Sequence, residues 1–429
     1  MLESRLKLWQ WNLIQGSVLI FPLQSELGGL GLFVACIGIC RLHWRDIFRN
    51  PLVWGLGVLT LWLLTITVLS PRPIDSALGI MNFMPFFFMF MNISWAIDRP
   101  SQLRRLAWLL VIPSLVVVVM GWGQLFLGWS KPQFLNYLVL WPLVPHGNPP
   151  GRMSSVFMYA NILGAYLLTV FILNLGLWID TYRRKELQKG QLGFLTLSLI
   201  MNAIGLYLTN SRNAWVLAFL ACLCFAFYLG WRTLVGVFVF LGVSVMVSAW
   251  GPSPLKEILR RFIPRSIWAR LSDEMFQNRP LATLRVTQWQ FTLDMTRRHP
   301  LTGWGLRSFT PMYQQSWGEW LGHPHSLYLM LMAETGITGL LLFSAWVGWI
   351  YVRAIALLRR LQPDEGQLLL FTYMVAFAGC IFFNTVDVTV ADGKMNTINW
   401  LLLSSIGGMV VEAWRQKVLP HNQHYSPSP

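Results

Sequence analysis

Long stretches without a charged residue constrain this chain more than any other feature of its sequence. Residues 51–70 and 106–128 each contain about twenty consecutive uncharged residues, the length that a helix needs to cross about 30 Å of hydrocarbon. Only 12% of all residues are charged, whereas a soluble domain has about 25%. The sequence therefore predicts an all-α, polytopic membrane protein and excludes a water-soluble domain.

Apolar stretches separated by polar breaks predict about twelve transmembrane helices. They cover residues 8–23, 27–40, 51–70, 78–97, 106–128, 153–179, 191–208, 214–229, 233–250, 326–352, 368–386 and 397–413. The first contains Gln10, Asn12 and Gln15 and lacks a small-residue cleavage site, so we expect a retained helix and not a removable signal peptide. All five cysteines lie within these stretches, which predicts neither a disulfide framework nor a metal site.

The distribution of positive charge predicts the orientation of the chain. If the N-terminus is cytoplasmic, 18 of the 33 Lys and Arg residues fall on the cytoplasmic side and only five on the short external loops. Short loops rich in Lys and Arg stay in the cytoplasm, so we expect both termini there. The other ten lie in the long segment 251–324, which we expect outside because long loops are translocated largely regardless of charge.

The segment 251–324 is the longest piece of chain outside the apolar stretches, and we expect it to contain short helices. It contains ten basic and five acidic residues, and this excess of positive charge suggests an anionic partner. Residues 255–263 predict an amphipathic helix that lies on the bilayer, with Arg260 and Arg261 near lipid headgroups. Residues 281–298 predict a second helix, in which Arg285 and Trp289 are one turn apart. A guanidinium beside an aromatic ring can be held rigidly while it binds phosphate.

Two histidines precede the next apolar stretch. Pro324 favours a helix start, so we expect His323 as its cap and His325 in its first turn. This helix runs inward, and a histidine at its external end could act as a base near neutral pH. The alternative is an interfacial histidine that only caps the helix. Glu334 lies half a turn out of phase with His325, so we expect it to be paired or functional elsewhere.

Other charged residues lie at external turns. Arg152 and Arg212 precede inward-running stretches, where a helix N-terminus already favours anions. Arg212 lies in a turn of about five residues that holds it near membrane depth. Each arginine could equally anchor its helix at the interface. Asp387 and Asp392 flank the last external turn, where simple solvation would explain them.

Several patches together resemble the O-antigen ligase and polymerase superfamily of bacterial envelope glycan enzymes. SRNAW (211–215) resembles the family's Ser-Arg-Gly-Ala motif, with Asn213 in place of glycine. Arg285 through PLTGWGLRSF (300–309) is similar to a stretch in which an Arg and a Trp precede a Pro-Gly-Gly turn. PHSLYLMLMAETGITGLLLF (324–343) resembles the His-Asn, Tyr-Leu, Glu-Gly and Gly-Leu signature, with Ser326 where asparagine is usual. GRMSSVFMYANILGAYLL (151–168) is similar to the family's upstream stretch.

The resemblance implies a metal-independent, inverting glycosyltransferase without a cofactor, at the periplasmic face of a bacterial inner membrane. It would move a glycan from an undecaprenyl-diphosphate carrier to an acceptor hydroxyl of a glycan, lipid or protein. Arg212 and Arg285 would bind the diphosphate, and His325 would deprotonate or position the acceptor hydroxyl. Arg152, His323 and Trp289 are further candidates for substrate binding. A ligase and a polymerase of this kind differ only in the acceptor.

The resemblance also divides the chain. Residues 1–190 would form N-terminal transmembrane helices, 191–352 the ligase-related core with loop 251–324, and 353–429 a C-terminal helix pair with a disordered tail at 420–429. The lipid bilayer is an expected partner and nucleic acid is not.

Two other functions remain compatible with the sequence. A membrane transporter, including one for inorganic carbon, would use intramembrane polar residues such as Glu334, Asn92, Asn174 and Asn202. A structural scaffold for an envelope complex would explain the basic loop, but not the placement of His325 with three external arginines.

Overall fold

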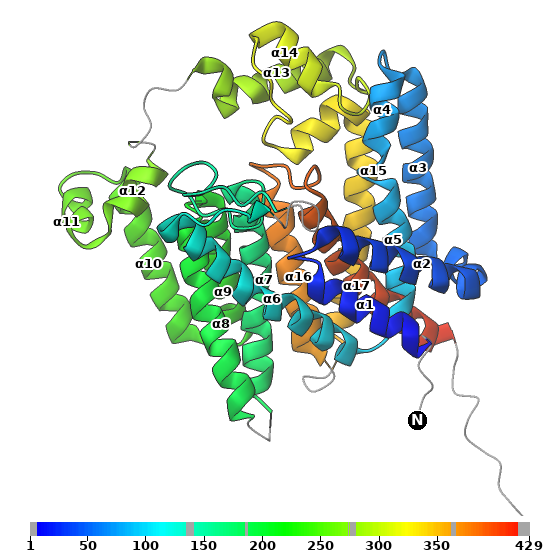
Figure 1. The fold of residues 1–429 in the computed structure, drawn as a ribbon, viewed down its shortest axis with the longest axis horizontal. Coiled ribbons are helices and arrows are strands. Elements are labelled where there is room, and N and C mark those ends of the chain that lie inside the picture. The colour runs from blue at the N-terminus through cyan, green and yellow to red at the C-terminus, as the bar shows by residue number, and fades with distance from the viewer. Residues whose placement is uncertain are drawn as a thin grey trace, which may run out of the picture.

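A computed structural model describes residues 7–133, 141–184, 188–272, 274, 280–361 and 366–418. Within these ranges the regular elements are all helical, as predicted (Figure 1). The first half contains α1 (Leu8–Ile20), α2 (Ser25–Phe48), α3 (Pro51–Leu69), α4 (Pro73–Ile80), α5 (Met84–Ala96), α6 (Pro100–Leu127), α7 (Ala160–Tyr182) and α8 (Lys189–Leu208). The second contains α9 (Arg212–Tyr228), α10 (Arg232–Trp250), α11 (Leu255–Phe262), α12 (Arg265–Leu271), η2 (Leu281–Thr283), α13 (Arg285–Arg298), α14 (Phe309–Trp317), α15 (Leu327–Leu358), α16 (Leu368–Phe383) and α17 (Gly393–Val418). The tail 420–429 lies outside the described residues.

The predicted apolar stretches all overlap helices, although some boundaries differ. The stretch 78–97 is divided between α4 and α5, and α7 begins only at Ala160, inside the predicted 153–179. Among the described residues, eight helical segments are long and apolar enough to cross a membrane: α2, α3, α4 with α5, α6, α7, α8, α10 and α15. Helices α9 and α16 are apolar but shorter. The multi-pass architecture is therefore confirmed, while the count of twelve spans stays a prediction.

Proline determines where several N-terminal helices begin. Helices α3, α4 and α6 start at Pro51, Pro73 and Pro100. Proline fits the first helical position because its φ is already helical and the N–H it lacks would have no partner there. At α3 the side chain of Asn50 also accepts a bond from the N–H of Leu52 at 3.0 Å.

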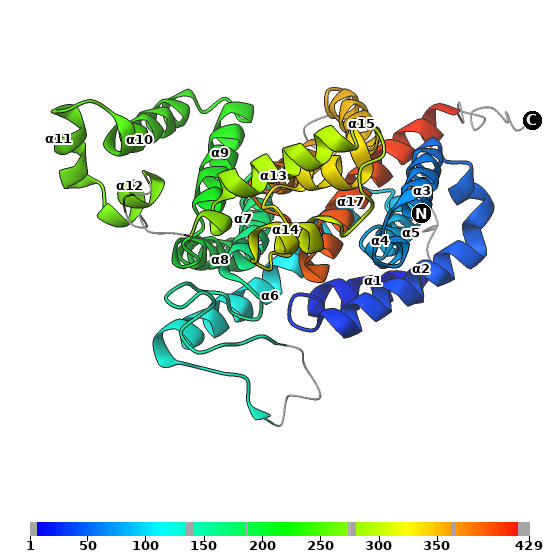
Figure 2. The ribbon, with the colours of Figure 1, turned by 90° about the horizontal axis from the view of Figure 1, so that it is seen from above.

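Helix α7 forms the centre of the bundle, and α10 lies at its edge. In the most apolar window of α7, 83% of the residues are buried, against 11% in α10. Helix α7 packs against α6, α8, α9 and α16, whereas α10 packs only against α9, α11 and α12 among the larger helix contacts. Figure 2 shows α10, α11 and α12 at one end of the molecule. Most of the surface of α10 is therefore left for lipid.

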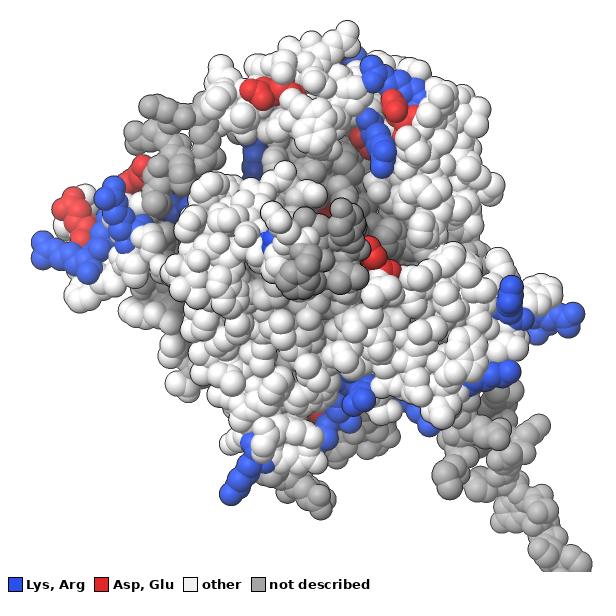
Figure 3. Space-filling model, viewed as in Figure 1, with Lys and Arg blue, Asp and Glu red and all other residues white. Residues whose placement is uncertain are grey.

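The charged side chains are unevenly distributed over the surface. Figure 3 shows Lys and Arg along the lower edge, over α11 and again at the upper right, while the middle of this face is largely uncharged. The lower edge is the end at which the described N-terminal residues begin (Figure 1). Lys and Arg thus lie towards both ends of the molecule in this view, and the orientation stays a prediction.

Helix α15 is broken at Gly336, where the segment 300–309 inserts against it. Gly336 has φ 74° and ψ 169°, and a Cβ there would collide with the carbonyl of Leu301. The N–H of Gly305 donates to the carbonyl of Glu334 at 2.9 Å. The inserted segment thereby satisfies backbone groups that the break exposes, which is necessary in a helix long enough to span lipid.

The side chain of Glu334 caps α14. Its carboxylate accepts bonds from the backbone N–H groups of Arg307 and Phe309, the latter at 3.3 Å. A carboxylate at a helix N-terminus is stabilised by the unpaired N–H groups and the helix dipole. The expectation that Glu334 is paired is confirmed, and its partners belong to the loop.

Candidate active site

The turn between α8 and α9, the start of α15 and the turn after α16 meet at the upper end of the bundle (Figure 1). The N–H of Leu327 donates to the carbonyl of Asn384 at 2.9 Å, which joins α15 to the turn after α16. The side-chain amide of Asn213, on the first turn of α9, donates to the carbonyl of Phe383 at 2.9 Å. Asn213 thus ties α9 to α16, a structural role that glycine could not fill.

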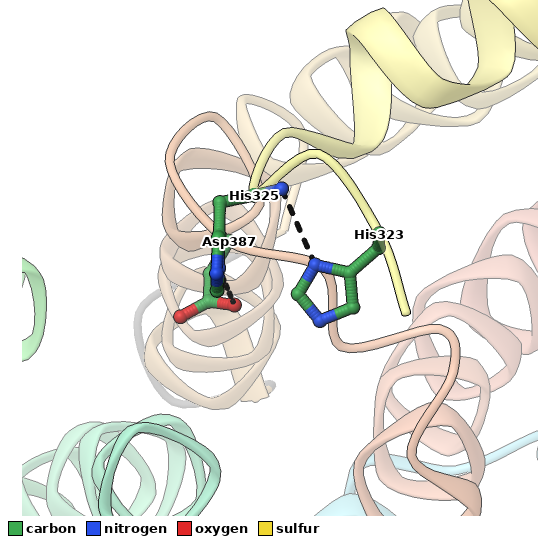
Figure 4. A group of neighbouring side chains, drawn as sticks. All are labelled: His323, His325 and Asp387. Carbon is green, nitrogen blue, oxygen red and sulfur yellow. Dashed lines mark hydrogen bonds and ion pairs between the residues drawn. The ribbon is translucent and has the colours of Figure 1, made fainter. Parts of the chain in front are cut away.

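The two histidines lie just before α15 and not within it, so the predicted helix start is wrong. Helix α15 begins at Leu327, and Ser326 is its cap, with its hydroxyl 3.5 Å from the N–H of Leu329. Serine is among the best cap residues because its oxygen reaches that amide. His325 instead has a left-handed backbone with φ 50°, which few residues other than glycine adopt. This turn directs its side chain away from the helix axis (Figure 4).

His323 is held by the backbone of its neighbour. The N–H of His325 donates to Nδ1 of His323 at 3.2 Å, so Nδ1 carries no proton. Burial, followed by the positive charges of His325 and Arg285, lowers the pKa of His323 to about 4 against the opposing effect of Asp387. His323 is therefore neutral at pH 7, with its proton on Nε2.

Asp387 is buried beside His325, and the expectation of a solvated turn residue is wrong. Its Oδ1 lies 3.5 Å from Nδ1 of His325 and accepts a bond from the N–H of Val388 at 2.9 Å (Figure 4). Its Oδ2 accepts from the amide of Asn161 at 2.9 Å. Burial raises the pKa of Asp387, but the contact with His325 and the charges of both histidines outweigh it and lower the pKa to about 2.

The pair of His325 and Asp387 defines which ring nitrogen can exchange protons. An ionised carboxylate beside Nδ1 favours the tautomer with the proton on that nitrogen. The lone pair of His325 is then on Nε2, the atom that can accept a proton from another group. A protonated His325 would be stabilised by Asp387.

Arg152 connects this pair to the turn before α9. Its Nε donates to the carbonyl of Thr209 at 2.9 Å, and its Nη2 donates to Oδ1 of Asn161 at 2.5 Å. Burial and the charges of nearby arginines lower its pKa to about 10, so Arg152 stays charged at neutral pH. It does not lie at a helix start as predicted, because α7 begins only at Ala160.

Arg212 and Arg285 are each the first residue of a helix. Arg212 begins α9 after Ser211, as predicted, and its Nη1 donates to the carbonyl of Arg270 at 2.7 Å. Arg285 begins α13, four positions after the start predicted at residue 281. The charge of Arg285 acts on both His323 and Arg152, so the loop brings it to the same place.

Trp289 fixes the histidine segment against α13. Its indole Nε1 donates to the carbonyl of Pro324 at 3.0 Å, between the two histidines in the sequence. This contact gives Trp289 a positioning role. Because Arg285 and Trp289 are one turn apart on α13, the same contact also fixes the position of Arg285 relative to the histidine segment.

An apolar cavity of about 290 Å³ begins beside these residues. Leu327, Tyr328 and Asn384 line it near the site, and it continues between α15, α16 and α17 past Phe377 to Tyr351. Its walls are mainly aromatic and aliphatic side chains, at a depth where the surrounding helices are apolar. Such a cavity fits a hydrocarbon chain.

His323, His325 and Asp387 also place three potential metal-ligand atoms within 4.8 Å of one another. The surroundings are unfavourable for a cation, because Arg152 lies in the field of Arg212, Arg270 and Arg285. These charges favour an anion instead.

The comparison with protein-family models finds a match for part of the chain. Residues 197–344 match the O-antigen ligase family. The resemblance is therefore confirmed for the segment that carries Arg212, Arg285, Trp289, His323 and His325. No curated protein matches the chain. Arg152 and Asp387 lie outside the matched segment, and the fold brings them to it.

Proposed function

We propose that this protein is a glycosyltransferase that moves a glycan from an undecaprenyl-diphosphate carrier to an acceptor hydroxyl at the periplasmic face. The family match supports a membrane enzyme of the O-antigen ligase or polymerase type. One observation supports both the proposed donor and the proposed mechanism. Groups suited to binding a diphosphate and a group suited to proton transfer lie in the same site. Several guanidinium groups suited to a diphosphate act on Arg152, and Asp387, which also acts on Arg152, lies beside a histidine suited to proton transfer.

In the proposed reaction, His325 Nε2 takes the proton of the acceptor hydroxyl. The acceptor oxygen then bonds to the anomeric carbon of the donor on the face opposite the diphosphate. The bond between that carbon and the diphosphate oxygen breaks, so the configuration is inverted and undecaprenyl diphosphate leaves. Arg212 and Arg285 neutralise the charge that develops on the leaving oxygen. Asp387 stabilises the imidazolium formed in the step.

The apolar cavity supports a lipid-linked donor over a soluble sugar nucleotide. A diphosphate bound by the arginines would sit near Leu327 and Asn384, where the cavity begins. The first isoprene units could then enter between α15 and α17 without leaving an apolar environment. A soluble donor would have no use for this space.

The transporter alternative is weakened, because the residue that most favoured it has a different role in the structure. Glu334, the acidic group expected to line a path, caps α14 instead. Asn202 donates to Ser114 and Ser198 within the helix bundle. The family match points to transfer chemistry and gives no support to transport.

The direct test uses purified protein with a glycan linked to undecaprenyl diphosphate and a hydroxyl acceptor. We expect transfer to continue in EDTA, because the arginines take the place of a metal at the diphosphate. We expect the anomeric configuration of the new glycosidic bond to be opposite to that of the donor. NMR of the product measures this configuration. Deleting the gene should in parallel change the length or attachment of envelope glycans. Absence of transfer from a range of lipid-linked donors would argue against the proposal.

Replacing Asp387 with asparagine should lower kcat by about 100-fold while the protein still folds and inserts. Asparagine keeps the shape and a partner for Asn161, but it removes the negative charge beside His325. Protonated His325 then loses its counter-charge. We therefore also expect the acid limb of the kcat/KM profile to move to lower pH, measured between pH 5 and 9.

The matched control is Asp294→Asn on α13, where the carboxylate is 57% exposed and pairs with Arg297. This variant should keep the wild-type rate and pH profile, since an exposed ion pair contributes little. If Asp387→Asn lowers the rate without moving the pH profile, Asp387 has only a structural role.

A further inference from the structure

A second cavity, which we call the charged hollow, lies between the beginning of α2, the segment before α7 and the beginning of α17. Its volume is about 410 Å³. It shares no described lining residue with the apolar cavity beside His325. Asn396 and Trp400 of α17 line the apolar cavity, whereas Thr397 lines the charged hollow. Helix α17 therefore lies between two cavities, and only one of them belongs to the site described above.

A lysine ammonium is fixed in the wall of the charged hollow. The Nζ atom of Lys394 donates to the carbonyl of Val156 at 2.9 Å and to that of Pro22 at 3.4 Å. The same atom lies 4.9 Å from the ring centre of Phe157, a cation–π contact. These contacts come from two different segments of the chain, so the positive charge has a defined position in the hollow.

Two carboxylates line the same hollow. Glu26, in the first turn of α2, accepts a bond from the hydroxyl of Ser25 at 2.8 Å. Asp392 caps α17, because its Oδ1 accepts a bond from the N–H of Met395 at 2.9 Å. Asp392 is therefore more than the solvated turn residue that the sequence suggests. Both carboxylates act electrostatically on Lys394, so the hollow presents charges of both signs within a short range.

An apolar groove of about 180 Å³ continues from the charged hollow. Gly29, Phe86 and Thr397 line both spaces. Beyond them the groove is lined by side chains of α2 and α5: Leu32, Phe33, Cys36, Pro85, Phe88 and Met89. Both helices belong to segments that are long and apolar enough to cross a membrane. Phe33 and Pro85 are exposed, so the groove opens towards hydrocarbon.

We propose that the charged hollow and the apolar groove bind a bilayer phospholipid whose headgroup carries a primary ammonium, of the phosphatidylethanolamine type. The ammonium lies between Glu26 and Asp392, and the phosphate lies at Lys394. One acyl chain passes Gly29 into the groove. A headgroup with charge of one sign would meet like charge on one side of the hollow. A soluble zwitterion would leave the groove unused. The site is independent of the proposed glycan transfer.

The test measures lipid binding to the delipidated full-length protein in detergent by native mass spectrometry. We expect Kd for dioleoyl-phosphatidylethanolamine to be about tenfold lower than for phosphatidylcholine or phosphatidylglycerol with the same chains. The quaternary ammonium of phosphatidylcholine has no N–H to donate, and phosphatidylglycerol has no ammonium. Phosphoethanolamine without chains should bind about 100-fold more weakly, because it buries no hydrocarbon. Equal affinity for phosphatidylglycerol, or for phosphoethanolamine, would overturn the proposal.

Gly29→Leu tests whether the lipid occupies the junction of the hollow and the groove. A Cβ at Gly29 would meet only the ring of Phe21, at an ordinary distance of 3.8 Å. The backbone therefore accepts the substitution, while the rest of the leucine side chain fills the junction. We expect Kd for phosphatidylethanolamine to rise by more than about tenfold, since packed atoms exclude the chain. Gly57→Leu, on an exposed face of α3 where a Cβ meets nothing within 4 Å, is the control and should bind as the wild type.

Glu26→Gln tests the recognition of the ammonium, and it decides the proposal even if Gly29→Leu fails to insert. We expect the preference for phosphatidylethanolamine over phosphatidylglycerol to fall from about tenfold to about twofold, since one charge-assisted contact is lost. Glu257→Gln is the matched control, because Glu257 is also exposed and accepts a bond from a serine hydroxyl, that of Ser253, at 2.8 Å. An unchanged preference in Glu26→Gln, or an equal loss in Glu257→Gln, would show that the hollow does not recognise the headgroup.

Discussion

Replacing His325 with alanine should reduce kcat for glycan transfer by about 1,000-fold, within the range for the loss of a general base. The donor should still bind with nearly the wild-type Kd, because the arginines hold the diphosphate. The physical reason is that the other histidine of the described site cannot replace it, because Nδ1 of His323 already accepts a backbone bond. Rates with a lipid-linked donor and the amount of protein inserted in the membrane measure the effect.

His299→Ala is the matched control for this prediction. His299 is exposed at the end of α13 and packs against Trp304, away from the histidine segment. Its loss should leave kcat within about twofold of the wild type, as for most surface substitutions. A His325→Ala enzyme that retains more than a tenth of the wild-type kcat would exclude His325 as the general base.

The helical architecture could be predicted because lipid imposes it. Every backbone polar group in hydrocarbon must be satisfied within the protein, so each apolar stretch of sufficient length has to be helical. The break at Gly336 could not be predicted in the same way. It depends on backbone partners from Pro300 to Gly305, which are distant in the sequence from the groups that they satisfy.

The predicted positions of the two histidines relative to the helix depended on which of two helix-start signals was followed. Pro324 at a first helical position and Ser326 as a cap are both favourable patterns, and they differ by three residues. The structure uses Ser326, whose hydroxyl faces the N–H of Leu329. The left-handed backbone of His325 then follows from the turn that joins the loop to the helix, which local propensity does not predict for histidine.

Asp387 escaped the sequence analysis because its partner is distant in the sequence. Asp387 lies far from His325 along the chain, in a short turn where most acidic residues are solvated. Only the packing of α15 against the turn after α16 makes Asp387 a partner of His325.

Arg212→Ala and Arg285→Ala should each lower kcat/KM by about 100-fold or more, because each removes a cation from the developing negative charge. Lysine at either position should restore only part of the activity, since it keeps the charge and loses the fork geometry. Initial rates over a range of donor concentrations measure both effects. Arg298→Ala, at the exposed end of the helix that Arg285 begins, should behave as the wild type.

The double variant distinguishes a shared ligand from two separate structural roles. If Arg212 and Arg285 bind the same diphosphate, the first substitution already misplaces it, and the second should cost less than it does alone. Independent contributions to stability at α9 and α13 would instead give additive losses. Arg212 requires this comparison because it also donates to the carbonyl of Arg270, so its loss could loosen α12. Less than additive losses in kcat/KM, with unchanged thermal stability in each single variant, would show that the two helices present their first residues to one anion.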